Sequence, residues 1–173
     1  MTDEERRGPR IVGSLRAADG EGVVRMEDRF DTGIDDLWSA LTDPGRLARW
    51  LGEVGGELRI GGELRLHYYA SGWEGTGRIE VCEPPRRLRI RTAESGSSDS
   101  HVTEVTLTED GGSTMLVLEE GGVPLDNLAG YGAGTQVHID DLAAYLRGSE
   151  RHDARVRIEE LYPAYRTLAD RVG

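Results

Sequence analysis

The stretch that decides the fold is Phe30–Leu51, FDTGIDDLWSALTDPGRLARWL, because two helical periodicities follow each other within it. The first has the i, i+3, i+4, i+7 spacing of an amphipathic helix, carried by Ile34, Leu37, Trp38 and Leu41. We expect Asp31 or Thr32 to cap it. Asp43 and Pro44 then supply an N-cap and a first-turn proline for another helix, whose apolar face is Leu47, Trp50 and Leu51. The stretch therefore predicts two short helices.

Strand patterns lie on both sides of this stretch. Upstream, the break around Asp19-Gly20 separates Ile11–Arg16 from Val23–Phe30, which predicts a hairpin. Downstream, six short runs alternate with turns that are mostly rich in Gly and Pro, which is typical of an antiparallel meander. These runs are Glu57–Ile60, Glu63–Ala70, Trp73–Cys82, Arg87–Ala93, His101–Thr108 and Thr114–Glu120.

The C-terminal third returns to helical spacing. Val123–Gly134 has the composition of a loop or a frayed helical turn, and Thr135–Leu146 is predicted as a helix that Gly148 ends. Arg155–Val172 carries a second helical pattern in which Pro163 is expected to cause a kink or a break. We predict a flexible N-terminus over residues 1–9, one domain over 10–148, and a helical extension over 149–173. That extension packs on the domain or on a partner, for which a homodimer is one possibility.

Composition excludes several classes of function. The 173 residues suit one domain. All 21 basic residues are arginine, against 32 acidic residues, and the net charge of −11 argues against binding to duplex nucleic acid or to an anionic membrane. Without lysine there is no Schiff-base or P-loop chemistry. Cys82 is the only cysteine and cannot form an internal disulfide. With no signal-peptide or membrane-spanning run, we predict a cytoplasmic protein.

The order of hairpin, two short helices, antiparallel sheet and long C-terminal helix is the helix-grip arrangement. The opening stretch resembles the START-like (SRPBCC) superfamily, in the branch of homologues of the heat-shock-protein ATPase activator. The resemblance covers about residues 23–148, and its further motifs are Gly61-Gly62, Gly72–Gly77, Glu83–Leu88, Tyr131–Gly134 and Asp140–Leu146. Relatives commonly have Gly-Trp where this chain has Gly134-Thr135, a difference that removes an aromatic side chain from the expected cavity wall.

The resemblance implies an α+β helix-grip (START-like) fold, with a curved sheet of six or seven antiparallel strands around a long helix and an apolar cavity between them. It implies binding of a hydrophobic small molecule, without a cofactor. Two alternatives stay open, namely an enzyme of cyclase or hydratase type that uses the same pocket, and a module that interacts with a chaperone ATPase. No catalytic signature is common to the branch, and fold alone does not determine function.

Nine side chains are the predicted lining of this cavity, which is expected to be mostly apolar with a few polar groups. They are Trp38, Trp50, Tyr69, Trp73, Tyr131, Thr135, His138, Ile139 and Leu142. Plain core packing is the alternative for each of them, and it is favoured for Trp38 and Leu142. Tyr69, Trp73, Tyr131 and His138 carry polar atoms that an apolar core would have to satisfy.

Other polar pairs were weighed for chemistry. His138 and Asp141 lie one helical turn apart, which suits an imidazole oriented by a carboxylate, although such pairs are also common on solvated faces. Glu119 and Glu120 are strand neighbours that point to opposite faces, and a solvated edge is the favoured interpretation for them. The four histidines lie in separate elements without the spacing of a zinc site, so no metal is predicted.

Overall fold

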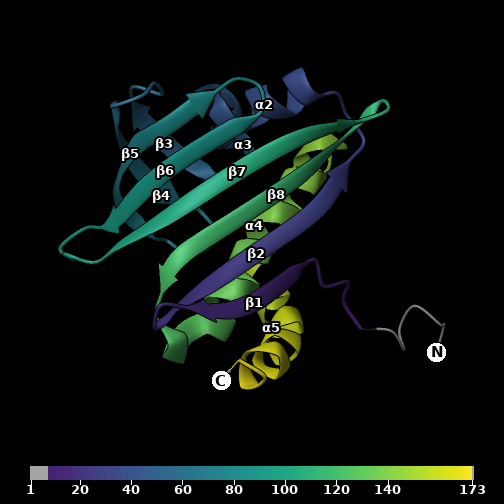
Figure 1. Cartoon of the computed structure of the whole chain (residues 1–173). Coiled ribbons are helices and arrows are strands. Elements are labelled where there is room, and N and C mark those ends of the chain that lie inside the picture. Colours follow the sequence, from purple (N-terminus) through teal and green to yellow (C-terminus); the bar gives the residue numbers. More distant parts are fainter. Residues whose placement is uncertain (1–7, 173) are drawn as a thin grey trace.

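The computed structural model describes residues 8–172, which form a curved sheet and a helical layer (Figure 1). Eight antiparallel strands follow the order β1-β2-β8-β7-β6-β5-β4-β3. The strands are β1 Gly13–Ala18, β2 Glu21–Phe30, β3 Gly52–Gly56, β4 Glu63–Tyr68, β5 Glu74–Glu83, β6 Arg87–Glu94, β7 Ser100–Asp110 and β8 Ser113–Val123. The helices are α2 Ile34–Thr42, α3 Pro44–Trp50, η1 Leu125–Asn127, α4 Leu128–Leu146 and α5 Ala154–Asp170. The α+β helix-grip prediction is confirmed. Most of the predicted flexible N-terminus lies outside the described residues.

Two short helices follow the first hairpin, as the opening stretch predicts. The Asp43 carboxylate accepts a hydrogen bond from the backbone N–H of Gly45 at 2.9 Å and caps α3, with Pro44 in the first turn. The cap of α2 differs from the prediction, because Gly33 occupies the N-cap position. Thr32 instead donates its hydroxyl to the carboxylate of Asp36 in the first turn, at 2.7 Å.

The strand prediction is wrong for Glu57–Ile60. Strand β3 comes directly after α3, and residues 57–62 form the turn into β4, closed by a hydrogen bond from Gly62 N–H to the carbonyl of Arg59. Because glycines take the place of apolar residues in β3, its sequence shows no strand periodicity. One of them, Gly52, has no room for a side chain, because a Cβ there would lie 2.0 Å from the carbonyl oxygen of His67 on β4. With β3 and both hairpin strands included, the sheet has eight strands instead of six or seven.

Helix α4 begins at Leu128, seven residues before the predicted start at Thr135. Glycines 130, 132 and 134 made this segment look like a loop. The structure gives one of them a packing role, because a Cβ on Gly132 would lie 2.6 Å from the ring of Tyr165 on α5. The small residue therefore lets the two helices approach closely.

Helix α5 packs on α4 and β1 of the same chain, below the sheet in Figure 1. Its Leu161 and Tyr165 are fully buried, and Arg157 forms an ion pair of 2.9 Å with Asp140 on α4. Pro163 lies inside the helix, which continues past it to Asp170. Asp141 and Ala144 on α4 are also fully buried.

Candidate ligand-binding cavity

A cavity of about 610 Å³ lies between α4 and the inner face of strands β4 to β8, with the first two helices at one end. Alternation along the strands turns every second side chain toward it, as Leu64, Leu66 and Tyr68 show on β4. Its walls are mostly apolar. The apolar lining consists of Leu41, Leu47, Trp50, Leu51, Val54, Leu58, Leu64, Leu66, Ile79, Leu88, Ile90, Val105, Leu116, Leu118, Ile139 and Ile158, among others.

Aromatic rings line part of this cavity. The Tyr68 ring stacks on Trp73, with centroids 5.1 Å apart, and meets the edge of the His138 ring at 5.2 Å. The indole of Trp50 donates to the backbone carbonyl of Ala40 at 3.0 Å, so its polar atom is satisfied and its ring faces the cavity. This arrangement suits the flat face of a ligand ring, because aromatic pairs favour stacked and edge-to-face contacts.

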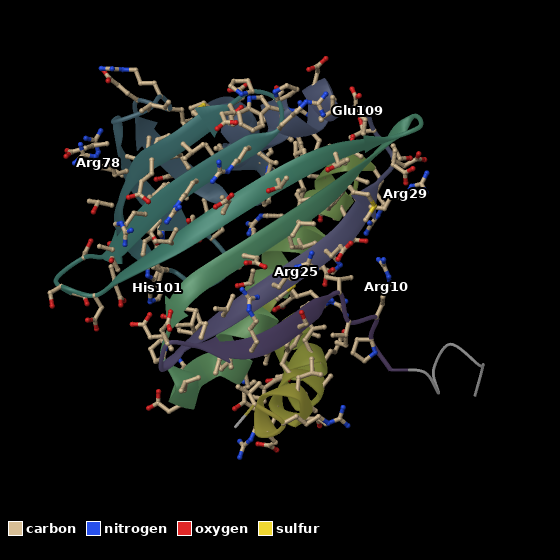
Figure 2. All side chains as sticks on the ribbon, viewed as in Figure 1. Arg10, Arg25, Arg29, Arg78, His101 and Glu109 are labelled. Carbon is tan, nitrogen blue, oxygen red and sulfur yellow. The ribbon has the colours of Figure 1, made fainter. Side chains whose placement is uncertain are left out.

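Several polar side chains lie close to Glu120 on β8. One carboxylate oxygen lies 3.6 Å from Nδ1 of His101 on β7, and the other lies 3.4 Å from the hydroxyl of Thr135 on α4. The ring of Tyr131 meets His101 with centroids 5.2 Å apart. His101 is labelled in Figure 2 near the start of β7. Three elements therefore bring one carboxylate, one imidazole and two hydroxyl groups to the same part of the cavity.

These surroundings shift the proton affinities of the cavity side chains. The hydrogen bond to Glu120 raises the pKa of His101 above its ordinary value. Burial lowers the pKa of His138, so its imidazole is neutral at pH 7. Burial also raises the pKa of the Tyr68 and Tyr131 hydroxyls, with the Glu120 charge adding to the effect in both. Both tyrosines therefore carry protons that they can donate.

Six of the nine predicted residues line this cavity: Trp50, Trp73, Tyr131, Thr135, His138 and Ile139. The other three do not line it. Trp38 packs on both apolar clusters of the interior, and Leu142 is fully buried in the larger one. Tyr69 lies under the guanidinium of Arg151, 4.6 Å from its ring centroid. A ligand-binding role for the six stays a prediction.

Several polar residues of the cavity were not predicted from the sequence, among them Tyr68, His101 and Glu120. The alternation of Leu64 and Leu66 continues to Tyr68, so the choice of Tyr69 was wrong by one residue. For Glu119 and Glu120 the opposite faces were predicted correctly, but the solvated-edge interpretation is wrong for Glu120. Glu119 pairs with Arg16 on the outer face, whereas Glu120 points inward.

The hypothesis of a His138–Asp141 pair is wrong. Asp141 instead accepts a hydrogen bond from the backbone N–H of His152 at 2.8 Å, and its same oxygen lies 3.0 Å from Nδ1 of that histidine. Asp141 therefore ties the segment before α5 to α4. The His138 Nε2 atom is buried and has no hydrogen-bond partner among residues 8–172.

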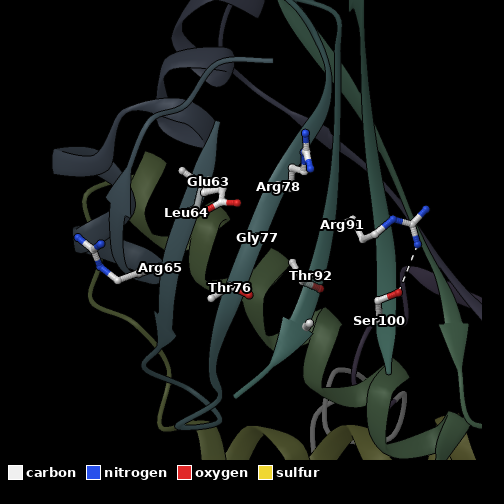
Figure 3. A pocket seen from close by; sticks show the side chains of 10 residues that line it. Glu63, Leu64, Arg65, Thr76, Gly77, Arg78, Arg91, Thr92 and Ser100 are labelled. Atoms are coloured by element: carbon white, nitrogen blue, oxygen red, sulfur yellow. Dashed lines mark hydrogen bonds between the residues drawn. The ribbon is translucent and has the colours of Figure 1, made fainter. Parts of the chain in front are cut away.

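A second hollow of about 330 Å³ lies on the opposite face of β4 to β6 (Figure 3). Arg65, Arg78 and Arg91 line it, and Arg91 donates to the Ser100 hydroxyl at 3.3 Å. These side chains are exposed, and no aromatic ring is among the lining residues. The inner cavity, which is larger and lined by aromatic rings, is therefore the stronger candidate for a ligand site.

Comparison with known proteins identifies the family. The model of the family described as "Activator of Hsp90 ATPase homolog 1-like protein" matches residues 31–147. The chain belongs to this family. The resemblance seen in the sequence is thereby confirmed, and the fold is one that ligand-binding and polyketide-cyclase-like proteins share. No curated protein matches the chain in sequence.

Several solved structures are similar to this member of the family. The crystal structure of CalU16 from Micromonospora echinospora is 30% identical, covers 91% of this chain and 96% of its own, and has a TM-score of 0.74. DynU16, a protein in the dynemicin biosynthetic locus, is 28% identical with a TM-score of 0.70, covering 79% of this chain and 51% of its own. PFC0360w, an HSP90 activator from Plasmodium falciparum, shares the fold at 18% identity and a TM-score of 0.52, over 60% of this chain and 74% of its own.

No helix within residues 8–172 is long and apolar enough to cross a bilayer.

Proposed function

We propose that this chain binds a hydrophobic small molecule in the cavity between α4 and strands β4 to β8. The observation that supports the proposal is a volume of about 610 Å³ with mostly apolar walls and a few polar groups gathered around Glu120. Sites for small molecules are typically about 300–1,000 Å³ with this kind of lining. The similarity to DynU16, a protein in a biosynthetic locus, agrees with a small-molecule role.

The size of the cavity favours this function over plain core packing. Protein interiors are close-packed, with few voids larger than a water molecule. The rest of the interior follows that rule, as the fully buried Met26, Leu142 and Tyr165 show. The hollow differs from the rest of the interior, because it is partly open to solvent and leaves apolar side chains that an occupant would cover.

The alternative of an enzyme in the same pocket is supported by one observation. His138 is held neutral by burial, its ring meets the Tyr68 ring at 5.2 Å, and both line the cavity. A neutral imidazole and a protonated phenol are groups that can accept and donate a proton during a reaction. The chaperone-interacting alternative is supported only by family membership and by the shared fold of the Plasmodium falciparum activator.

Gly134 offers a sharp test of the binding proposal. It lies in the middle of α4, it lines the cavity, and a Cβ there would meet no atom within 4 Å. We expect Gly134→Leu to fill the cavity and to weaken binding of the neutral dye Nile red at least about tenfold. The same variant should raise the free energy of unfolding, by about 0.5–1 kcal/mol, because glycine is a poor residue in a helix interior.

The matched control is Gly134→Ala, which gains the helix propensity but adds only a methyl group. We expect it to be stabilised like the leucine variant and to bind Nile red nearly as well as the wild type. Fluorescence titration gives the affinity and urea denaturation the stability. Unchanged binding in the leucine variant, or no binding in the wild type, would contradict the proposed site.

A further inference from the structure

Apart from two histidines, the charged side chains that line the cavity are all acidic. Glu94 and Glu120 line it, and His101 and His138 are the basic groups on its walls. No arginine of the described residues is among the lining residues, although the chain has 21 arginines. Without an arginine, this lining offers no guanidinium to pair with a ligand carboxylate or phosphate.

The arginines of the same strands point to the other face of the sheet. Arg65, Arg78 and Arg91 line the outer hollow in Figure 3, and Arg91 also contacts Glu80 at 3.1 Å. Strand alternation thus places these guanidinium groups on the outer face, where they pair with outer carboxylates such as Glu80, whereas Glu120 points into the cavity. A ligand in the cavity meets the carboxylates directly.

Glu120 keeps hydrogen-bonding capacity for such a ligand. An ionised carboxylate has about four acceptor positions. Its two neighbours are His101 at 3.6 Å and the Thr135 hydroxyl at 3.4 Å, both longer than the usual range of about 2.5–3.2 Å. The Glu120 side chain is 16% exposed. A carboxylate this loosely satisfied in a mostly apolar cavity gains from a further donor.

The walls also indicate the shape of the ligand. Tyr68, Trp73 and His138 form a continuous set of ring contacts along the cavity, and Trp50 and Tyr131 add two further rings to its lining. Flat rings pack against such walls with better contact than a flexible chain, which would also lose rotamer entropy.

From these observations we infer that the cavity selects an aromatic, ring-containing ligand with a hydrogen-bond donor, a hydroxyl or a protonated amine, directed at Glu120. It discriminates against ligands that present a carboxylate there, because two like charges would then face each other in a poorly solvated space. This inference rests on the proposed function and adds the chemical class of the ligand to it.

Four probes with one apolar body test the inference. Naphthalene, 2-naphthol, 2-naphthylmethylamine and 2-naphthoate differ only in the group that would meet Glu120, and the quenching of tryptophan fluorescence or calorimetry measures their affinities at pH 7. We expect at least one donor probe to bind about tenfold more tightly than 2-naphthoate, since a hydrogen bond to a charged group contributes on that scale. The hydroxyl and amine arms show which donor the cavity takes.

Glu120→Gln is the decisive variant, because it keeps the shape of the side chain and removes the charge. We expect the ratio of donor to carboxylate affinity to fall to within a few-fold of unity. The matched control is Glu119→Gln, which removes the neighbouring charge from the outer face, where Glu119 contacts Arg16 and Arg25. That control should keep the wild-type ratio.

The outcomes separate the two proposals. If Nile red binds and Glu120→Gln keeps the wild-type ratio, the inference about the donor is overturned while the binding function stands. Binding of Nile red without binding of any naphthyl probe has the same meaning, because the ligand class is then wrong. If neither Nile red nor any naphthyl probe binds the wild type, the proposed function itself fails.

Discussion

Two polar side chains on α4, two residues apart, have opposite environments. The amide oxygen of Gln136 accepts from the backbone N–H of Val12 at 3.2 Å and from the Tyr165 hydroxyl, and its nitrogen donates to the carbonyl of Arg10 at 2.7 Å. His138 points toward the cavity, and its Nε2 has no partner among residues 8–172. On one side of α4 the amide of Gln136 is fully hydrogen-bonded, and on the other side His138 faces the cavity with an unpaired nitrogen. We call these the closed side and the open side of the helix.

The difference separates a structural cluster from a candidate functional one. An unpaired buried polar group destabilises a protein by about 1–3 kcal/mol, so most groups that hold the fold together are paired, although Arg89 Nε and Asp141 Oδ2 have no partner among residues 8–172. The Gln136 cluster follows this rule, because it joins the N-terminal segment, α4 and α5. The buried Nε2 atom of His138 at the cavity does not, so it is available to a hydrogen-bonding group of a ligand. The following predictions can break or sharpen this comparison.

The largest effect is expected for Tyr165→Ala on the closed side. Tyr165 is fully buried between α4 and β1, and its hydroxyl contacts Gln136. Loss of a buried aromatic side chain should lower the free energy of unfolding by about 3–5 kcal/mol. Below the unfolding transition, Nile red affinity should change less than twofold, because Tyr165 does not line the cavity. Urea denaturation and dye titration measure the two effects, and a loss of affinity in the folded variant would contradict the separation.

A smaller effect is expected from a matched pair on α4. Gln136→Met keeps the side-chain length but leaves the groups of Val12, Arg10 and Tyr165 unpaired, so we expect a destabilisation of at least about 1–3 kcal/mol. His138→Leu removes an unpaired buried nitrogen and should change stability by less than about 1 kcal/mol. The affinity for Nile red should show the reverse order and change only for His138→Leu. Equal destabilisation by both variants would show that the contrast has no energetic basis.

The smallest effects are expected from pH, and they have opposite signs at two histidines. Glu120, with Asp99 and Glu21 nearby, raises the pKa of His101, so its stabilisation is present below the ordinary value of 6.5 and is lost as pH rises through the raised pKa. Burial lowers the pKa of His138, against the charges of Glu120 and Asp141. The unfolded chain therefore takes up that proton more readily, and this histidine reduces stability as pH falls below 6.5.

Titration of the histidine ring protons by NMR measures both shifts. We expect one midpoint above 6.5 and one below it, and Glu120→Gln should lower the midpoint of His101 in particular. Two midpoints at the ordinary value would contradict the environments described for the cavity.

Much of the fold could be predicted from the sequence. The apolar spacing of Ile34–Leu41 and the Asp43-Pro44 start of the next helix were sufficient for α2 and α3, because local periodicity and capping specify short helices directly. The predictions failed where glycines replace the apolar residues that carry the period, at β3 and at the first turns of α4. In both places, tertiary contacts hold the backbone in a state that the local sequence does not favour.

The candidate site was less predictable for a different reason. Periodicity tells which residues share a face, but it does not tell what covers that face. Leu142 and His138 share one side of α4, yet only His138 lines the cavity, and the buried Asp141 is hydrogen-bonded to His152 in the segment before α5.

The sequence by itself determined the family, the order of the elements and the absence of lysine chemistry, since these depend on local patterns and composition. Only the tertiary structure decided that Glu120 and Tyr68 face inward while the strand arginines face outward. That choice depends on strand pairing over long sequence distances, where a shift of one residue turns every side chain to the other face. The same pairing decides which polar groups have hydrogen-bond partners and which do not.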